Sequence, residues 1–386
     1  MDLLGSENKG AGASLVRVNV AVEKIAGSFA IAGDLVDYKE VHSGHINTTF
    51  MVTYSDQGVI NRYIMQRINE QVFKNPHEVI QNVGYVTKHI NSKVLRHRSD
   101  MGGQTLNLYP SREGDFFVEG ERGGVWRCYN FIEGCKTYDI VESTRQAYQA
   151  AKAFGSFQDL VSDLDAHKLA ETIPDFHHTA KRLENLIRVA ETDPLGRLEG
   201  VRAEYEFIVK RSELCGELVA LQESGALPVR VTHNDTKLNN VMMDSETDQA
   251  VCVIDLDTVM PGLSVYDFGD LVRTATSPAA EDEQDLSKVD MRMSYFEALA
   301  EGYIDGCSAL SKEESEYLVT GAKLITLETG IRFLADHLEG DVYFKVDRDE
   351  HNLDRARTQL KLVEKIEEHE DAMNAFVQRV MKSTKR

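Results

Sequence analysis

Residues 231–240 read VTHNDTKLNN and carry the spacing H-x-D-x-K-x-x-N, which suits the transfer of a phosphoryl group. In such a loop an aspartate orients the acceptor hydroxyl and an asparagine holds magnesium, and Asp235 and Asn240 occupy these positions. Lys237 adds a cation that would stabilise the charge spread over the moving phosphoryl group. A polar turn between two strands is the alternative, but four matched positions in one loop favour the catalytic interpretation.

A second metal ligand is expected on the strand that follows this loop. Asp255 comes 20 residues after Asp235, at the end of the apolar run 251–254. A two-stranded hairpin would bring Asp255 back beside Asn240, so that their oxygen atoms could bind one magnesium ion. The sequence therefore predicts that Mg2+ and ATP bind next to the catalytic aspartate.

The tripeptide Asp267-Phe268-Gly269 matches the metal-binding motif of protein kinases, but its position argues for another role. It lies 32 residues after Asp235, which is too far along the chain for the returning hairpin. We interpret it as the start of the next helix, where Asp267 or Asp270 would brace the catalytic loop by accepting backbone hydrogen bonds.

The segment 41–50, VHSGHINTTF, is predicted to form a turn over the nucleotide phosphates, with Gly44 and small polar neighbours. It is not a loop of the GxxxxGK[ST] type, because it lies between strands and not before a helix. Taken alone, the segment is explained best as a plain hairpin turn.

The elements that would position these residues form a β-rich part and a helical part. Alternating apolar and polar residues predict hairpins over 31–66, a helix is predicted over 76–95, and more strands are predicted within 106–132. Two short strands around the catalytic loop, within 228–256, interrupt the helical remainder. The predicted helices there cover residues 142–162, 179–192, 199–225, 285–305, 312–337 and 353–382.

This order predicts an α+β, two-lobed fold of the protein-kinase type, with a small antiparallel β N-lobe and a larger, mainly helical C-lobe. We assign 1–14 to a loose N-terminus, 15–130 to a nucleotide-binding lobe, and 131–386 to the helical lobe with the catalytic loop and substrate site. A chain of 386 residues is long enough for two cores with a cleft between them.

Composition narrows the classes of function. A net charge of −20 would repel nucleic acid and anionic membranes, whereas magnesium and local cations can still attract ATP inside a cleft. The five cysteines form no CxxC pair, so neither a disulfide scaffold nor a zinc site is expected. Because no signal-like start and no run of 18 apolar residues occurs, we predict a cytoplasmic protein. We expect it to be a monomer or a simple homo-oligomer.

Longer, irregular stretches extend these motifs: GHINTTF, YIMQRIN, WRCYNFIEG, FGSFQ, VTHNDTKLNN, VIDLDTVMPG, YDFGD, RFLADHLEGDVYF and HNLDRARTQLKLV. They resemble the aminoglycoside phosphotransferase and choline kinase superfamily and, within it, the bacterial N-acetylhexosamine 1-kinases. The resemblance covers the chain from about residue 30. It implies a kinase-like fold and the use of ATP and Mg2+ to phosphorylate the anomeric hydroxyl of N-acetylglucosamine or N-acetylgalactosamine.

The resemblance also implies roles for individual residues. Asp235 would be the catalytic aspartate, and Asn240 and Asp255 would be the metal ligands. Candidate sugar contacts come from four residues, the first of which could also contact the nucleotide: His45, Arg332, Asp341 and Tyr343.

Two of these candidates have structural alternatives. Arg332 could form an ion pair with Glu328 or Asp336, each of which is four residues away on a predicted helix. Tyr343 could stack on a pyranose ring or could be a buried structural tyrosine.

One departure from the wider superfamily concerns the nucleotide phosphates. The strand lysine that grips them is absent, and Gln66 stands in its place, followed by Arg67. Because neighbouring side chains on a strand face opposite ways, only one of the two can face the nucleotide.

Other nucleotide contacts are predicted less sharply. The helical partner of that missing lysine stays open among Glu78, Gln81 and Asn82. The adenine is expected beside residues 129–133, near Tyr129 and Phe131, where backbone groups would read its edge.

Two rival functions remain open. The acceptor could be choline, an aminoglycoside or another sugar; Arg332 argues against a cation, and the net charge of −20 argues for one. The missing lysine would also fit a nucleotide-binding pseudokinase that acts as a scaffold, which the intact Asp235, Asn240 and Asp255 oppose.

Overall fold

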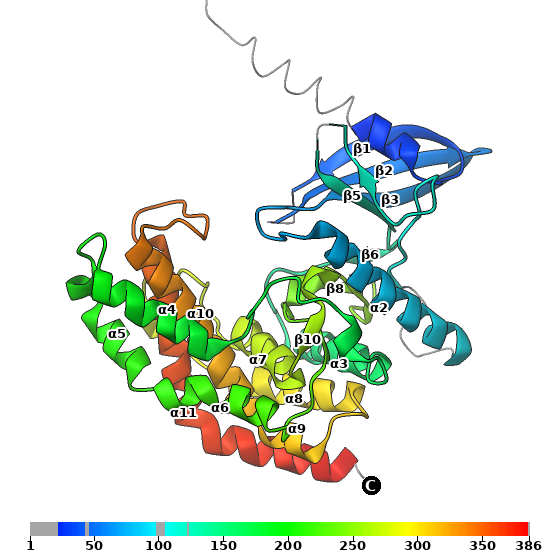
Figure 1. Ribbon diagram of the computed structural model, residues 1–386. Helices are drawn as coiled ribbons and strands as arrows, with labels where there is room; N and C mark the ends of the chain where they lie inside the picture. The colour runs from blue at the N-terminus through cyan, green and yellow to red at the C-terminus, as the bar shows by residue number, and fades with distance from the viewer. Residues whose placement is uncertain (1–21, 43–45, 98–104, 122, 385–386) are drawn as a thin grey trace, which may run out of the picture. The chain divides into compact units, whose positions relative to one another are not determined.

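The computed structural model describes residues 22–42, 46–97, 105–121 and 123–384 (Figure 1). The chain forms two compact units, Met1–Lys88 with Leu106–Glu133, and His89–Thr105 with Gly134–Arg386. The predicted loose N-terminus at 1–14 and the candidates Gly44 and His45 lie outside the described residues. An antiparallel sheet region and a larger helical part, the α+β architecture that the sequence predicts, are therefore both present.

The N-terminal unit contains a five-stranded antiparallel sheet with the strand order β1-β2-β3-β5-β4. The strands are β1 (Asp34–Val41), β2 (Thr48–Asp56), β3 (Val59–Arg67), β4 (Val118–Glu119) and β5 (Val125–Asn130). Gln57 and Gly58 join β2 to β3 and both have positive φ, as a tight two-residue hairpin turn requires. Helix α2 (Pro76–His97) begins at the predicted proline.

One face of this sheet is apolar. Phe50, Met65 and Cys128 lie on neighbouring strands in register and pack with the helical segment 22–28 into a buried cluster. Trp126 belongs to the same cluster, whereas the intervening residue of β5, Arg127, must face the opposite side of the sheet.

The predicted strand at 106–110 is wrong in extent. Within it only Leu108 forms a bridge, to Tyr129 of β5. The side chain of Asn130 accepts from the backbone N–H of Asn107 in place of a strand carbonyl, and Pro110 cannot donate to a sheet.

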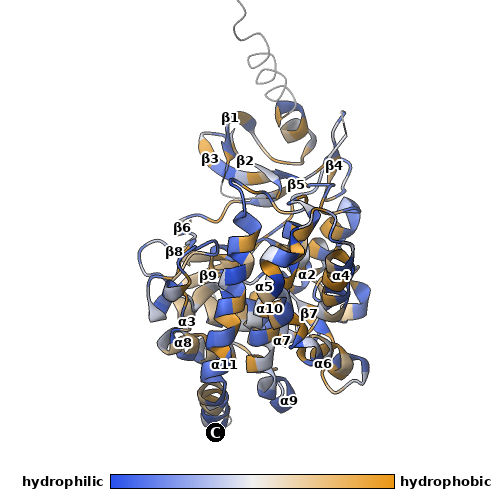
Figure 2. Cartoon of the chain, turned by 90° about the vertical axis from the view of Figure 1, so that its left-hand side faces the viewer, coloured by the Kyte–Doolittle hydropathy of each residue, from blue (hydrophilic) through white to orange (hydrophobic). Residues whose placement is uncertain are grey.

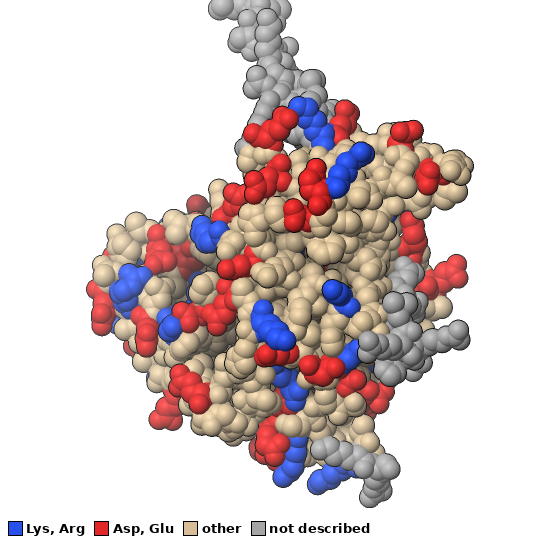
Figure 3. Space-filling model, turned by 45° about the vertical axis from the view of Figure 1, so that its right-hand side comes forward, with Lys and Arg blue, Asp and Glu red and all other residues tan. Residues whose placement is uncertain are grey.

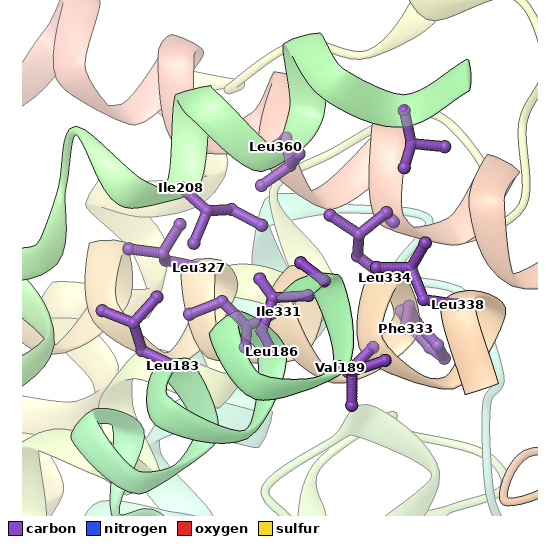
Figure 4. Close-up of a cluster of buried hydrophobic side chains, with 14 of the residues drawn as sticks. Leu183, Leu186, Val189, Ile208, Leu327, Ile331, Phe333, Leu334, Leu338 and Leu360 are labelled. Atoms are coloured by element: carbon purple, nitrogen blue, oxygen red, sulfur yellow. The ribbon is translucent and has the colours of Figure 1, made fainter. Parts of the chain in front are cut away.

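The C-terminal unit is mainly helical. Its helices are α3 (Thr144–Leu160), α4 (Thr179–Thr192), α5 (Arg202–Val209), α6 (Ser212–Glu223), α7 (Ser264–Ala275), α8 (Met293–Gly306), α9 (Lys312–Glu316), α10 (Leu318–Glu339) and α11 (His351–Thr384). Figure 4 shows side chains of α4, α5, α10 and α11 meeting in one apolar cluster, which includes Leu186, Ile208, Ile331 and Leu360. In Figure 2 apolar and polar residues both occur along α5 and α11, as partly exposed helices require.

Some predicted helices are shorter or broken. The predicted helix 199–225 is split into α5 and α6 at Lys210, and 312–337 is split into α9 and α10 at Tyr317. The predicted helix 285–305 begins only with α8.

Four short strands flank the predicted catalytic loop. β7 (Arg230–Thr232) pairs with β10 (Met260–Gly262), and β8 (Val241–Asp244) pairs with β9 (Ala250–Val253). The pair β8–β9 is the returning hairpin that the sequence predicts, and β6 (Cys135–Lys136) adds a strand to it.

Helices α7 and α10 approach each other closely because glycines meet where they cross. A side chain built on Gly269 would lie 2.5 Å from the carbonyl oxygen of Gly321, and one built on Gly321 would lie 2.3 Å from that of Val265. The glycine of the Asp-Phe-Gly tripeptide thus has a packing role, because it lets α7 lie against α10.

Acidic side chains spread over the face drawn in Figure 3, with fewer basic ones between them, in keeping with the net charge of −20. Among the described residues, no helix combines the length and apolar character needed to cross a membrane.

Candidate active site

The loop between β7 and β8 brings together three of the predicted site residues. Lys237 Nζ lies 2.9 Å from Asp235 Oδ2, and Asn240 Nδ2 lies 3.1 Å from the same oxygen. Asn240 Nδ2 also donates to the backbone carbonyl of Asp235 at 2.8 Å. A cation and an amide therefore hold the carboxylate of Asp235 in one orientation.

These contacts set the protonation of the loop. Burial opposes ionisation of Asp235, but Lys237, His233 and Asn240 together outweigh it, and the pKa of Asp235 lies below its ordinary value. Burial likewise opposes the charge on Lys237, but Asp235 and, more weakly, Asp255 raise its pKa. Near neutral pH the pair is a carboxylate and an ammonium.

Two buried aspartates of α7 brace the backbone of this loop, as the sequence predicts. Asp267 accepts from the backbone N–H groups of His233 at 3.0 Å and Asn234 at 2.7 Å, and from the side chain of Gln158 at 2.6 Å. Asp270 accepts from the backbone N–H of Thr236 at 2.9 Å. Burial raises the pKa of Asp267, and the donors around it oppose that rise.

Asp255 follows the end of β9 in the chain, as the predicted hairpin requires. The backbone N–H of Ile254 donates to the carbonyl of Asn240 at 2.9 Å, so the residue before Asp255 is in direct contact with Asn240. Asp255 is exposed and adopts the left-handed conformation, with φ 59°. A non-glycine residue held in this region often marks a functional position.

The oxygen atoms of Asn240 and Asp255 are compatible with binding of magnesium. Asn240 is buried and points its amide nitrogen at Asp235, so its amide oxygen has no hydrogen-bond donor among the described residues. That oxygen and the carboxylate of Asp255 are hard ligands of the kind Mg2+ prefers. No cluster of three or more His, Cys, Asp or Glu suited to a metal occurs in the described part of the chain.

In the N-terminal unit a polar row crosses three strands on the face opposite the apolar cluster. Thr49, Gln66 and Arg127 are direct neighbours in the register. Arg127 donates to Gln66 Oε1 from Nη2 at 2.8 Å and from Nε at 3.1 Å, and Gln66 Nε2 donates to Thr49 Oγ1 at 3.1 Å. Arg67 has the opposite orientation and lies close to Gly124. The cation beside Gln66 is therefore Arg127, which sequence reasoning missed.

The other predicted nucleotide contacts belong to β5 and the residues after it. Tyr129 is buried, and the guanidinium of Arg127 lies 4.9 Å from the centre of its ring. Phe131 packs under the guanidinium of Arg62 at 4.5 Å, and its backbone N–H donates to the carbonyl of Arg62 at 3.3 Å. Of the candidates on α2, Asn82 is buried, and Gln81 is exposed.

A buried contact between His177 and Glu328 connects the predicted catalytic loop to α10. His177 Nε2 lies 3.3 Å from the carbonyl oxygen of Asn234, the residue before Asp235, and His177 Nδ1 lies 2.9 Å from Glu328 Oε1. Thr179 donates to the other oxygen of Glu328 at 2.6 Å. Burial opposes ionisation of Glu328, but His177, Thr179 and Arg332 together outweigh it, and the pKa of Glu328 is lowered.

The predicted sugar contacts Arg332 and Tyr343 lie near each other: Arg332 is one turn beyond Glu328 on α10, and Tyr343 is in the loop after that helix. The Arg332 guanidinium stands 5.9 Å from the Tyr343 ring. Among the described residues it forms no ion pair within 4.0 Å, so the alternative of a close pair with Glu328 or Asp336 is not found, although the charge of Arg332 helps to lower the pKa of Glu328. The carboxylates of Glu328 and Asp336 accept hydrogen bonds from other groups. Tyr343 is 63% exposed, which makes the alternative of a buried tyrosine wrong as well.

The loop that carries Tyr343 is held by its backbone. Asp336 accepts from the N–H groups of Val342 at 3.0 Å, Tyr343 at 2.8 Å and Phe344 at 3.0 Å. Asp341, another predicted sugar contact, accepts from Arg197 at 2.9 Å and from Asn352 at 2.9 Å. These bonds engage both of its oxygens within the protein.

Comparisons with known proteins place the fold. The family model described as the phosphotransferase enzyme family matches residues 37–304. An aminoglycoside phosphotransferase from Alicyclobacillus acidocaldarius is 13% identical, with a TM-score of 0.60 over 93% of this chain and 96% of that one. A choline kinase from Cryptosporidium parvum is 14% identical, with a TM-score of 0.56 over 93% and 97% of the two chains.

A spectinomycin phosphotransferase, solved with ADP and spectinomycin, is 12% identical, with a TM-score of 0.50 over 90% of this chain and 98% of that one. At such identities the similarity defines the fold alone. The kinase-like fold predicted from the sequence is confirmed by these neighbours.

Proposed function

This chain belongs to the phosphotransferase enzyme family, and on that premise we propose that it transfers the γ-phosphate of ATP to the anomeric hydroxyl of an N-acetylhexosamine. The observation that carries the proposal is the arrangement of Asp235, Lys237 and Asn240 within hydrogen-bonding distance, with Asp255 on the adjacent hairpin. These are the groups that phosphoryl transfer needs: an orienting carboxylate, a cation and oxygen ligands for a metal.

In this proposal Asp235 accepts a hydrogen bond from the sugar hydroxyl and receives its proton. The sugar oxygen forms a bond to the γ-phosphorus as the bond to the β-phosphate oxygen breaks, and ADP leaves. Because the pKa of Asp235 is lowered, the carboxylate is a weak base, and orientation of the hydroxyl is its main contribution. Since the C1–O bond is untouched, 18O in the C1 hydroxyl should be retained in the sugar phosphate.

Asn240 and Asp255 would hold Mg2+, which, when bound, neutralises charge on the β- and γ-phosphates. Lys237, anchored by Asp235, would add a second positive charge. For the nucleotide we propose the face of the N-terminal sheet that carries Gln66 and Tyr129, because the other face is covered by the apolar cluster.

A sugar is favoured over the acceptors of the structural neighbours because of the surroundings of Arg332. Choline carries a permanent positive charge, and aminoglycosides carry several, whereas the side chains beyond Glu328 include a guanidinium and the exposed ring of Tyr343. Such a ring can stack on the apolar face of a pyranose. A different acceptor hydroxyl, on another sugar, choline or an aminoglycoside, is the second candidate, supported by those neighbours.

The test is acceptor-dependent release of ADP by the purified protein with ATP and Mg2+. N-acetylglucosamine and N-acetylgalactosamine should give turnover and a 1-phosphate product, and choline and kanamycin should not. In Asp235→Asn, kcat should fall by about 10² or more with ATP affinity nearly unchanged. Turnover with choline or kanamycin and none with either sugar would select the second candidate; near-normal turnover in Asp235→Asn would exclude its catalytic role.

A further inference from the structure

His177 is a largely buried histidine whose two ring nitrogens both meet hydrogen-bond acceptors. Nε2 lies 3.3 Å from the backbone carbonyl oxygen of Asn234, and Nδ1 lies 2.9 Å from Oε1 of Glu328. Neither a carbonyl oxygen nor an ionised carboxylate has a proton to donate. A neutral imidazole has one N–H and could serve only one of these partners, whereas an imidazolium serves both.

Glu328 decides where the proton of this contact lies. Burial opposes its ionisation, yet the pKa of Glu328 is lowered. Two of the causes, the hydroxyl of Thr179 and the positive charge of Arg332, act whether or not His177 is charged. Thr179 donates to Oε2 at 2.6 Å, and Arg182 of α4 also interacts electrostatically with this carboxylate. Glu328 is therefore the acceptor, and the proton belongs to the imidazole ring.

Two aromatic rings lie close to the imidazole of His177. The ring centres of Phe176 and Tyr266 lie 4.6 Å and 5.2 Å from the centre of the imidazole. Burial, together with the charge of Glu328, raises the pKa of Tyr266, so the tyrosine hydroxyl is uncharged near neutral pH. Aromatic rings attract cations within about 6 Å, so these neighbours suit a charged imidazolium.

The carbonyl that His177 reaches belongs to the peptide bond between Asn234 and Asp235. Because a peptide bond is planar, a donor that holds this oxygen also fixes the direction in which the chain enters Asp235. Asn234 has a φ of 64°, which is uncommon for a residue other than glycine and needs support from its surroundings. Asp267 supports the N–H side of Asn234, and His177 supports the carbonyl side.

We propose that His177 is a positioning residue, which as an imidazolium fixes the peptide bond between Asn234 and Asp235. The carboxylate of Glu328 balances the charge of the ring and holds it in place, and the fixed peptide bond keeps the carboxylate of Asp235 in its orientation. The proposal rests on the proposed function for the catalytic role of Asp235. The charge on His177 does not depend on which acceptor is phosphorylated.

Two amide variants separate the two hydrogen bonds of the ring. The amide nitrogen of His177→Gln takes the place of Nε2 and can donate to Asn234, whereas that of His177→Asn takes the place of Nδ1 and can donate to Glu328. With N-acetylglucosamine, ATP and Mg2+, kcat should stay within about threefold of the wild type in His177→Gln and fall about tenfold or more in His177→Asn. The KM for ATP should not change in either variant. His167→Asn is the matched control, because His167 is exposed.

Nuclear magnetic resonance tests the charge without any acceptor. In protein labelled with 15N-histidine, the signals that His177→Gln removes identify His177, and both of its ring nitrogens should carry a proton at pH 7. In uniformly labelled protein, the backbone amide signal of Asp235 should stay near its wild-type position in His177→Gln and move in His177→Asn. These spectra decide the proposal even if no acceptor gives turnover, so its failure is distinguishable from failure of the proposed function.

The proposal is overturned if His177 is a neutral ring at pH 7, or if the two folded variants change kcat to the same degree, as a purely structural role predicts. If His177→Asn does not fold, His177→Gln still decides: a displaced Asp235 signal in this variant, which keeps the donor to Asn234, overturns the positioning role.

Discussion

Two loops of the helical unit are anchored in the same way but differ in what they expose. Asp267 of α7 accepts two backbone N–H groups of the catalytic loop, and Asp336 of α10 accepts three from the loop after α10. Each aspartate is buried, at 0% and 3% exposure. Fixing backbone amides with one carboxylate orders a loop without any regular secondary structure.

The difference lies in the side chains. In the catalytic loop His233, Asn234 and Thr236 are buried, and Thr236 Oγ1 also donates to the carbonyl of Asp267 at 2.5 Å. In the second loop Val342 and Tyr343 are 75% and 63% exposed. The catalytic loop is therefore part of the core, so its geometry and the stability of the fold depend on the same contacts. In the second loop the side chains of Val342 and Tyr343 take no part in the bonds to Asp336, which leaves these two side chains available for a ligand.

The largest effect should come from Asp267→Ala. Three buried donors lose their acceptor, and each buried unsatisfied group costs about 1–3 kcal/mol, so the free energy of unfolding should fall by about 3 kcal/mol or more. Because the backbone beside Asp235 loses its brace, kcat should also fall by at least tenfold. Urea unfolding and steady-state kinetics measure the two effects, with Asp371→Ala, on the exposed side of α11, as the control. A variant as stable and active as that control would contradict the bracing role.

Asp336→Asn should show that the second loop has a different role from the first. An amide has one acceptor oxygen and cannot satisfy three N–H groups and Asn352 as the carboxylate does, so the loop carrying Tyr343 should loosen. We expect an acceptor KM about tenfold higher, an unchanged KM for ATP, and a loss of about 1–2 kcal/mol in the free energy of unfolding.

Asp349→Asn is the control for this prediction, because Asp349 is exposed in the same segment of the chain. A fall in kcat with an unchanged acceptor KM would show that this loop serves the chemical step and not acceptor binding.

Glu328 lies on α10 and bonds His177 beside the first loop, and its contribution to stability should depend on pH. Its folded-state pKa is lowered, so the folded protein binds fewer protons than the unfolded chain in this range, and the carboxylate stabilises the fold above the unfolded pKa. That stability is lost as the pH falls through the folded pKa. Glu328→Gln should therefore cost on the order of 2 kcal/mol near neutral pH and progressively less in acid. A difference in unfolding free energy that is constant between pH 7 and pH 3 would contradict this linkage.

The catalytic loop was predictable because its information is local. The spacing of Asp235, Lys237 and Asn240 within one turn fixes their contacts, and a short apolar run before Asp255 indicates a returning strand. The position of Asp267 alone, outside the reach of that hairpin, already indicated a bracing role.

The proposed acceptor side could not be predicted in the same way, because it would be assembled from distant segments. His177 and Arg182 lie about 150 residues from Glu328 and Arg332, and no motif connects them. Arg127 was missed because its neighbour Gln66 follows from strand register, which one sequence does not fix. A charged residue within the otherwise apolar strand VWRCY was the available signal.

The smallest effect is expected for Tyr343, and it decides whether exposure in the second loop means availability to a ligand. Because the ring is 63% exposed, Tyr343→Ala should change the free energy of unfolding by no more than about 0.5 kcal/mol. If the ring stacks on the sugar, the acceptor KM should rise several-fold while kcat and the KM for ATP stay the same, and Tyr343→Phe should behave like the wild type. An unchanged acceptor KM in Tyr343→Ala would remove this side chain from the acceptor site, and the ordering of the second loop by Asp336 would then serve Arg332 alone.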